Sequence, residues 1–230
     1  MDRPSPLAKL ILALAILGGV SFLAANRFSP PDPVMVVWKG SGVALLALYA
    51  ATRARTLDGW LLAAVLALGA TGDVLLETHG LVTGAVAFLA GHLTAIALYL
   101  RNRRPALDPS QLILAILIIP ATVITAWLLP ADRAGAPGVA FYSAGLALMA
   151  AAAWISRFPR LSVGLGALMF VASDLLIFAR SGPLEHNPWV GLAIWALYFA
   201  GQLRICLGVV GTLARRDPQA APSPSVPGRA

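Results

Sequence analysis

Two aspartates lie in stretches that are otherwise apolar enough to cross a membrane. Asp73 is part of "LALGATGDVLLETHG" (66–80), and Asp174 is part of "LMFVASDLLIFAR" (168–180). An ionisable group in the hydrocarbon region costs roughly 2.5–3.5 kcal/mol on insertion scales, and an aspartate is too short to reach water from that depth. Two carboxyls in a poorly solvated cavity tend to share one proton, which supplies an acid and a carboxylate for general acid–base catalysis. Either aspartate could be the acid.

Further polar side chains lie within the same apolar stretches. Lys39, Asp73 and Asp174 are each about five or six residues from the same end of their spans, roughly 8–9 Å deep. His92 and Gln202 are placed nearer the middle. Three charges at one depth predict a shared polar cavity. Each remaining residue also has a purely structural interpretation: Lys39 could extend to the surface, and His92 and Gln202 could hydrogen-bond between helices.

Two more charged residues lie near this group in the sequence. Glu77 is close to a helix end and is expected at the membrane interface. Arg204 follows Gln202 by two residues, so it points to a different face of the helix and is expected to extend toward the cytoplasm.

Composition places these residues in a membrane protein. The chain has 230 residues, of which 59% are hydrophobic and 12% charged, whereas soluble domains have roughly 25% charged residues; its mean hydropathy is +0.80. Because a spanning helix needs about 20 apolar residues, the pattern predicts an all-α, polytopic membrane fold with eight transmembrane helices, at 7–25, 34–52, 59–78, 80–100, 111–129, 138–156, 161–180 and 188–212. The lone Cys206 cannot form an internal disulfide and is expected to be ordinary packing.

The distribution of positive charge predicts the orientation. Twelve Lys and Arg residues fall on one side of the spans and three on the other, which places both termini in the cytoplasm. Residues 1–214 then form the transmembrane domain, and the Pro/Ala/Ser-rich segment 215–230 forms a disordered cytoplasmic tail. The net charge of +7 is scattered between apolar runs, so no nucleic-acid partner is expected. The first span could instead be a cleaved signal peptide.

The spans also contain an apparent internal repeat. "TGDVLL" (71–76) is similar to "ASDLLI" (172–177), which aligns Asp73 with Asp174. "AFLAGHL" (87–93) is similar to "LYFAGQL" (197–203), which aligns His92 with Gln202, and "WKGSG" (38–42) is more weakly similar to "FYSAG" (141–145), which aligns Lys39 with Tyr142. These pairs indicate two parallel four-helix halves related by an axis along the membrane normal, with the aspartates facing each other across it.

The same motifs, in this order and spacing, resemble the YhhN family, which includes the transmembrane protein 86 lysoplasmalogenases. The resemblance covers nearly all eight spans and omits the tail. It implies an integral-membrane ether hydrolase of a bacterial plasma membrane, which cleaves the vinyl ether bond of lysoplasmalogens to a fatty aldehyde and glycerophosphoethanolamine or glycerophosphocholine. The family's intramembrane aspartates correspond to Asp73 and Asp174.

Vinyl ether hydrolysis fits a pair of aspartates, because it needs one acid and one carboxylate, as glycoside hydrolysis does. His92 could orient one aspartate and Gln202 the water, while Lys39, with Tyr142 opposite it in the repeat, could contact the lipid phosphate. No cofactor or metal is required, although a metal site built from Asp73, His92 and Asp174 is an alternative. Paired carboxylates between parallel repeats would also suit a proton-coupled small-molecule or lipid transporter.

Overall fold

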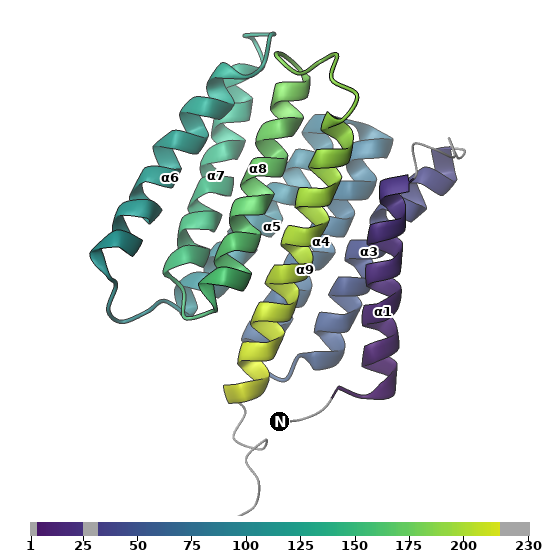
Figure 1. Ribbon diagram of the computed structural model, residues 1–230, viewed down its shortest axis with the longest axis vertical. Helices are drawn as coiled ribbons and strands as arrows, with labels where there is room; N and C mark the ends of the chain where they lie inside the picture. Colours follow the sequence, from purple (N-terminus) through teal and green to yellow (C-terminus); the bar gives the residue numbers. More distant parts are fainter. Residues whose placement is uncertain (1–3, 25–31, 217–230) are drawn as a thin grey trace, which may run out of the picture.

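The structure is a computed structural model that describes residues 4–24 and 32–216. Within these residues, eight helices are long and apolar enough to cross a membrane (Figure 1). They are α1 (Pro6–Ser21, continued by η1, Phe22–Ala24), α3 (Asp32–Arg53), α4 (Leu57–His79), α5 (Leu81–Arg101), α6 (Pro109–Leu128), α7 (Ala136–Ile155), α8 (Leu165–Arg180, preceded by the π-helical turn η2, Arg160–Gly164) and α9 (Val190–Arg216). The predicted all-α fold with eight spans is confirmed.

Local sequence explains several helix ends. The side chains of Thr56 and Asp108 accept hydrogen bonds from backbone N–H groups in the first turns of α4 and α6, which satisfies donors that the helix itself cannot. Gly80 adopts a positive φ of 83°, a conformation that glycine tolerates best. This single residue joins α4 to α5, so that Asp73 and His92 lie on adjacent antiparallel helices.

The bundle has two distinct ends. The first turn of α1 and the last turn of α9 lie at the same end, which we call the terminal end (Figure 1). The last helix reaches Arg216, two residues into the predicted tail, and residues 217–230 lie outside the described part of the chain. Large apolar side chains such as Val37, Phe141 and Leu161 are 70%, 73% and 79% exposed on the outside. This surface suits lipid, and the chain is an integral membrane protein.

Helix contacts follow the predicted repeat. In each half the first helix packs on the second (α1 on α3, α6 on α7), and the third packs on the fourth (α4 on α5, α8 on α9). The halves meet where the fourth helix of one contacts the second of the other, namely α5 on α7 and α9 on α3, and also where α9 contacts α4. The two halves are not identical, because α3 packs far more extensively on α4 than α7 does on α8.

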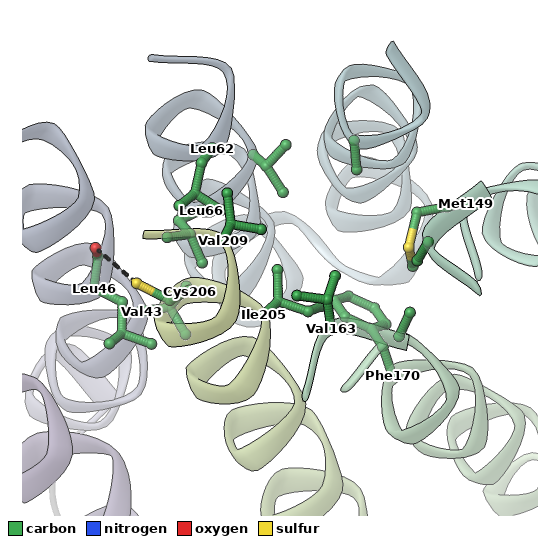
Figure 2. Packing of buried hydrophobic residues seen from close by; sticks show 14 of the residues in the cluster. Val43, Leu46, Leu62, Leu66, Met149, Val163, Phe170, Ile205, Cys206 and Val209 are labelled. Atoms are coloured by element: carbon green, nitrogen blue, oxygen red, sulfur yellow. Dashed lines mark hydrogen bonds between the residues drawn. The ribbon is translucent and has the colours of Figure 1, made fainter. Parts of the chain in front are cut away.

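An apolar core runs through the bundle, and Figure 2 shows part of it. Cys206 on α9 is fully buried there, and its thiol contacts the carbonyl oxygen of Leu46 on α3 at 3.9 Å. Leu66 lies two turns before Asp73 on α4, and Phe170 lies one turn before Asp174 on α8, and both are buried in this core. Both aspartates therefore adjoin the apolar core.

Candidate functional site

Asp73 and Asp174 occupy equivalent positions on their helices. Asp73 lies six residues before His79, the last residue of α4, and Asp174 lies six residues before Arg180, the last residue of α8. At 1.5 Å per residue each is roughly 9 Å inside the helix end. Their exposed fractions are 2% and 5%. The two carboxyls are thus buried at one depth, in the half of the bundle remote from the terminal end.

Both aspartates line one cavity of about 230 Å³. Its wall contains charged and polar side chains from four helices: Lys39, Asp73, Glu77, Ser173, Asp174, Arg180 and Tyr198. Apolar side chains from η1, α5 and α9, including Phe22, Phe88 and Trp195, complete it. Of the residues that the sequence predicted for a site, this cavity brings together Lys39, Asp73 and Asp174.

A chain of hydrogen bonds lies behind Asp174. The hydroxyl of Tyr142 on α7 donates to Asp174 Oδ2 at 2.6 Å. The Nε2 atom of His92 on α5 lies 3.1 Å from the same hydroxyl. His92 therefore reaches Asp174 through Tyr142 and not directly.

Asp73 has a different tyrosine partner. The hydroxyl of Tyr198 on α9 donates to Asp73 Oδ2 at 2.9 Å. Gln202 follows Tyr198 by one helical turn, and a methyl group placed at Gly69 would lie 3.0 Å from Gln202 Nε2 and 3.3 Å from the Tyr198 hydroxyl. Gln202 thus sits beside Tyr198, behind Asp73.

Tyr198 was missed by the sequence reasoning. It was visible in "LYFAGQL" (197–203), where it precedes Gln202 by four residues and so shares its helix face. The repeat alignment directed attention elsewhere, because it pairs Tyr198 with Phe88 and Tyr142 with Lys39. The two aspartates occupy equivalent positions in the repeat, but the two tyrosines that donate hydrogen bonds to them do not.

His92, Tyr142 and Gln202 do not line the main cavity. His92 and Gln202 line a second, much smaller cavity of about 20 Å³, together with Phe88, which borders both. Gln202 is 2% exposed, and its Oε1 has no hydrogen-bond partner within the described residues. The three predicted orienting residues therefore stand behind the aspartates and do not face the cavity itself.

Two cations lie on the main cavity. Lys39 Nζ is 2.6 Å from Glu77 Oε1, and their side chains are 12% and 37% exposed. Glu77, expected at the membrane interface, therefore forms an ion pair on the cavity wall. Arg180 lines the same cavity and is exposed, and it has no acidic partner within residues 4–24 and 32–216. Arg180 was not among the site residues predicted from the sequence.

The remaining intramembrane cation, Arg204, lies away from the site. Its guanidinium donates to the carbonyl oxygen of Leu161, in the π-helical turn that precedes α8. Its own carbonyl oxygen accepts from the Ser162 hydroxyl at 2.9 Å. Arg204 thus extends toward the terminal end of the bundle.

No group of three or more His, Cys, Asp and Glu side chains within the described residues has an arrangement that could hold a metal ion. In the alternative metal site, His92 would join the two aspartates, whereas its Nε2 contacts Tyr142.

Eight membrane-length helices around two buried aspartates on one cavity define a polytopic membrane protein with an intramembrane polar site. The chain belongs to the YhhN family, which it matches over residues 34–209, from α3 into α9. It is 31% identical over 175 residues to proteins named lysoplasmalogenase from Mycobacterium bovis and Mycobacterium tuberculosis. The match covers 72% of this chain and 66% of those relatives. No solved structure matches the chain significantly.

Proposed function

We propose that this protein is an integral-membrane hydrolase that cleaves the vinyl ether bond of lysoplasmalogens. One observation carries the proposal: two carboxyls, Asp73 and Asp174, are buried at one depth on one cavity. The names of the two mycobacterial relatives support the same activity. The products would be a fatty aldehyde and glycerophosphoethanolamine or glycerophosphocholine.

The proposed reaction uses both aspartates and regenerates them. The protonated aspartate transfers its proton to the β-carbon of the vinyl ether, and the double-bond electrons form the new C–H bond. The α-carbon becomes an oxocarbenium ion, which water attacks while the ionised aspartate takes a proton from that water. In the hemiacetal, the second aspartate returns this proton to the glycerol oxygen as the C–O bond breaks. The first aspartate takes the hydroxyl proton as the aldehyde forms.

The cavity also suits the remainder of a lysophospholipid. Its cations, Lys39 and Arg180, would contact the phosphate. The ammonium group of Lys39 pairs with Glu77, two residues before the end of α4, and Arg180 is the last residue of α8. A volume of about 230 Å³ is below the range of about 300–1,000 Å³ that holds a whole drug-sized ligand. The cavity would hold the headgroup side of the lipid and its vinyl ether, while the alkenyl chain remains in the bilayer.

The predicted orientation determines which half of the membrane contains the cavity. If both termini are cytoplasmic, the cavity lies in the outer half of a bacterial plasma membrane, because it is remote from the terminal end. A lysolipid of the outer leaflet would then place its vinyl ether just below the headgroup, at the depth of Asp73 and Asp174.

The test is aldehyde release by purified protein in detergent, with defined lysoplasmalogens as substrates. The matched control substrate is the saturated alkyl-ether lysolipid, which lacks the double bond that is protonated. We expect aldehyde from the first and none from the second. Detergent also separates the proposal from transport, since hydrolysis needs no sealed vesicle. Absence of aldehyde from monodisperse protein, together with substrate uptake in proteoliposomes, would favour the transporter.

A further inference from the structure

The smaller cavity lies where the two halves of the bundle meet, since its lining comes from α4 and α5 of one half and from α7, α8 and α9 of the other. Its volume is about 20 Å³. A cavity needs roughly 10–15 Å³ to hold one water molecule, and a buried water typically makes about three hydrogen bonds to polar groups around it. The cavity is therefore large enough for one water, and its polar atoms decide whether a water binds.

Three polar side chains line this cavity, and each has an unused hydrogen-bonding atom. Gln202 Oε1 and the Tyr99 hydroxyl are buried without a hydrogen-bond partner within the described residues. In the same part of the chain, the one hydrogen bond of the His92 ring joins Nε2 to Tyr142, so Nδ1 remains for another partner. Leaving a buried polar atom unpaired is costly, and nearly all such atoms bond to protein or to water.

A water molecule matches these three atoms whatever the direction of each bond. The amide oxygen of Gln202 accepts, and the Tyr99 hydroxyl can donate or accept. The Nδ1 atom of His92 donates in one tautomer and accepts in the other. Because water has two donors and two acceptor sites, it satisfies either tautomer. The site therefore requires no particular protonation state of the protein.

The same cavity separates the hydrogen bonds that support the two aspartates. On one side, His92 contacts Tyr142, the donor to Asp174. On the other side, Gln202 lies beside Tyr198, the donor to the other aspartate. His92 and Gln202 are the residues that the repeat aligns, on α5 and α9. A water between them would join the two sets of hydrogen bonds at the junction of the halves.

The small cavity is screened from the main cavity by Phe88, which lines both. The Phe88 ring makes edge contacts with Phe170 and Tyr198 at 6.1 and 5.9 Å between centroids. It also packs closely on α4, because a methyl group at Gly72 would lie 2.8 Å from it. A water in the small cavity is thus held apart from the substrate, and its role is to position protein groups.

We propose that the small cavity binds one buried water molecule, which bridges His92 on α5 and Gln202 on α9 and so links the supports of the two aspartates. The water connects equivalent helices of the two halves, which make little direct contact with each other. His92 and Gln202 are then positioning residues that act on the aspartates through Tyr142 and Tyr198. The water site itself does not depend on the proposed function, whereas its effect on turnover does.

The first test is an experimental structure of the purified protein at a resolution that shows ordered water. It should contain one water within about 3.2 Å of Gln202 Oε1, His92 Nδ1 and the Tyr99 hydroxyl. Gln202→Leu should lose this water. A small cavity without water density in the wild-type protein would overturn the proposal.

The second test is thermal unfolding in one detergent. Tyr99→Phe and Gln202→Leu should each lower the melting temperature by roughly 2–4 °C, because each removes a hydrogen bond to the water. If these atoms were unpaired, their removal should instead raise it. Ser143→Ala is the matched control, since the Ser143 hydroxyl is also buried without a partner in the described residues but does not line this cavity. It should not lower the melting temperature, and a rise for Gln202→Leu would overturn the site.

The third test measures the positioning role by aldehyde release. His92→Leu and Gln202→Leu should each lower kcat by about 10-fold with little change in KM, because neither residue lines the main cavity. The double variant should cost little more than the worse single variant, since one water links the two residues. His92→Gln should recover part of the loss, because it supplies the amide that the repeat places at the equivalent position.

Two results would separate this proposal from the proposed function. Additive losses in the double variant would overturn the link between the two supports, even in a fully active hydrolase. A protein that holds the water and shows the expected melting temperatures, but releases no aldehyde from any lysoplasmalogen, would refute the proposed function and keep the water site.

Discussion

The ammonium group of Lys39 and the carboxylate of Glu77 form a 2.6 Å ion pair between α3 and α4 on the wall of the main cavity. Their pairing gives Lys39 two possible roles, as a phosphate contact or as a partner for Glu77 alone. The two roles predict different changes in KM when Lys39 and Glu77 are substituted.

Lys39→Met should raise KM by roughly 10-fold or more and change kcat less, because a phosphate contact is made in both the ground state and the transition state. Glu77→Gln is the matched variant, because it breaks the same ion pair and keeps the cation. It should leave KM unchanged or lower it. Steady-state kinetics on a lysoplasmalogen in detergent measure both values. An equal rise of KM in the two variants would reduce Lys39 to a partner for Glu77.

Arg180→Gln should also raise KM, since Arg180 is a second cation on the cavity. The control is Arg133→Gln, because Arg133 lies beyond α6 and its guanidinium donates to the Trp127 carbonyl oxygen at 2.7 Å. The control should keep a normal KM. If both variants behave alike, Arg180 acts through general surface charge and not through a specific phosphate contact.

Asp73→Asn and Asp174→Asn should each lower kcat by roughly 100-fold or more, because each removes one partner of the acid–base pair. The double variant should cost little more than the worse single variant, since residues that act as a unit are not additive. The wild-type pH profile should be bell-shaped and report the pair. Near-normal turnover in either monodisperse single variant would exclude the two-aspartate mechanism.

The matched control for this series is Asp58→Asn. Asp58 bonds to Arg101 and Asn102 at 2.9 Å each, at the terminal end of the bundle. Asp58→Asn should lower thermal stability more than it lowers kcat. The comparison separates the structural effect of losing a carboxylate from the catalytic effect of losing one that lines the cavity.

The packing of α8 on α9 makes a prediction about stability. A methyl group at Gly201 would lie 2.7 Å from the Gly166 carbonyl oxygen, whereas one at Gly138 would meet nothing within 4 Å. Gly201→Ala should therefore destabilise the protein by about 1–3 kcal/mol, as overpacked cores do. Gly138→Ala should not. Thermal unfolding in one detergent compares them, and equal melting temperatures would show that α8 and α9 separate at little cost.

The predicted orientation can be tested with reporters fused after residue 216. An enzyme reporter that is active only outside the cytoplasm should be silent, because twelve of the fifteen positive charges near or beyond the ends of the spans lie on the side of both termini. The same reporter placed between α8 and α9 should be active. The reverse pattern would place the cavity in the inner half of the membrane.

The number and limits of the helices could be predicted from the sequence, because spanning a bilayer is a local requirement on about 20 successive residues. The depth of Asp73 and Asp174 followed from the same counting, since rise per residue converts position into depth. Their placement on one cavity was predicted from this common depth, and the repeat predicted that they face each other. Each of these inferences uses only residues close in the chain or a periodicity between two halves.

Only the tertiary structure decided which side chains meet. Tyr198 and Asp73 are 125 residues apart, and their contact depends on the rotation of α9 about its axis and on how it packs against α4. Hydropathy does not encode that rotation, because apolar residues surround most of each membrane helix. The same reason explains why His92 was placed beside an aspartate but lies behind Tyr142. Depth is a property of one helix, whereas a hydrogen bond between helices is a property of their packing.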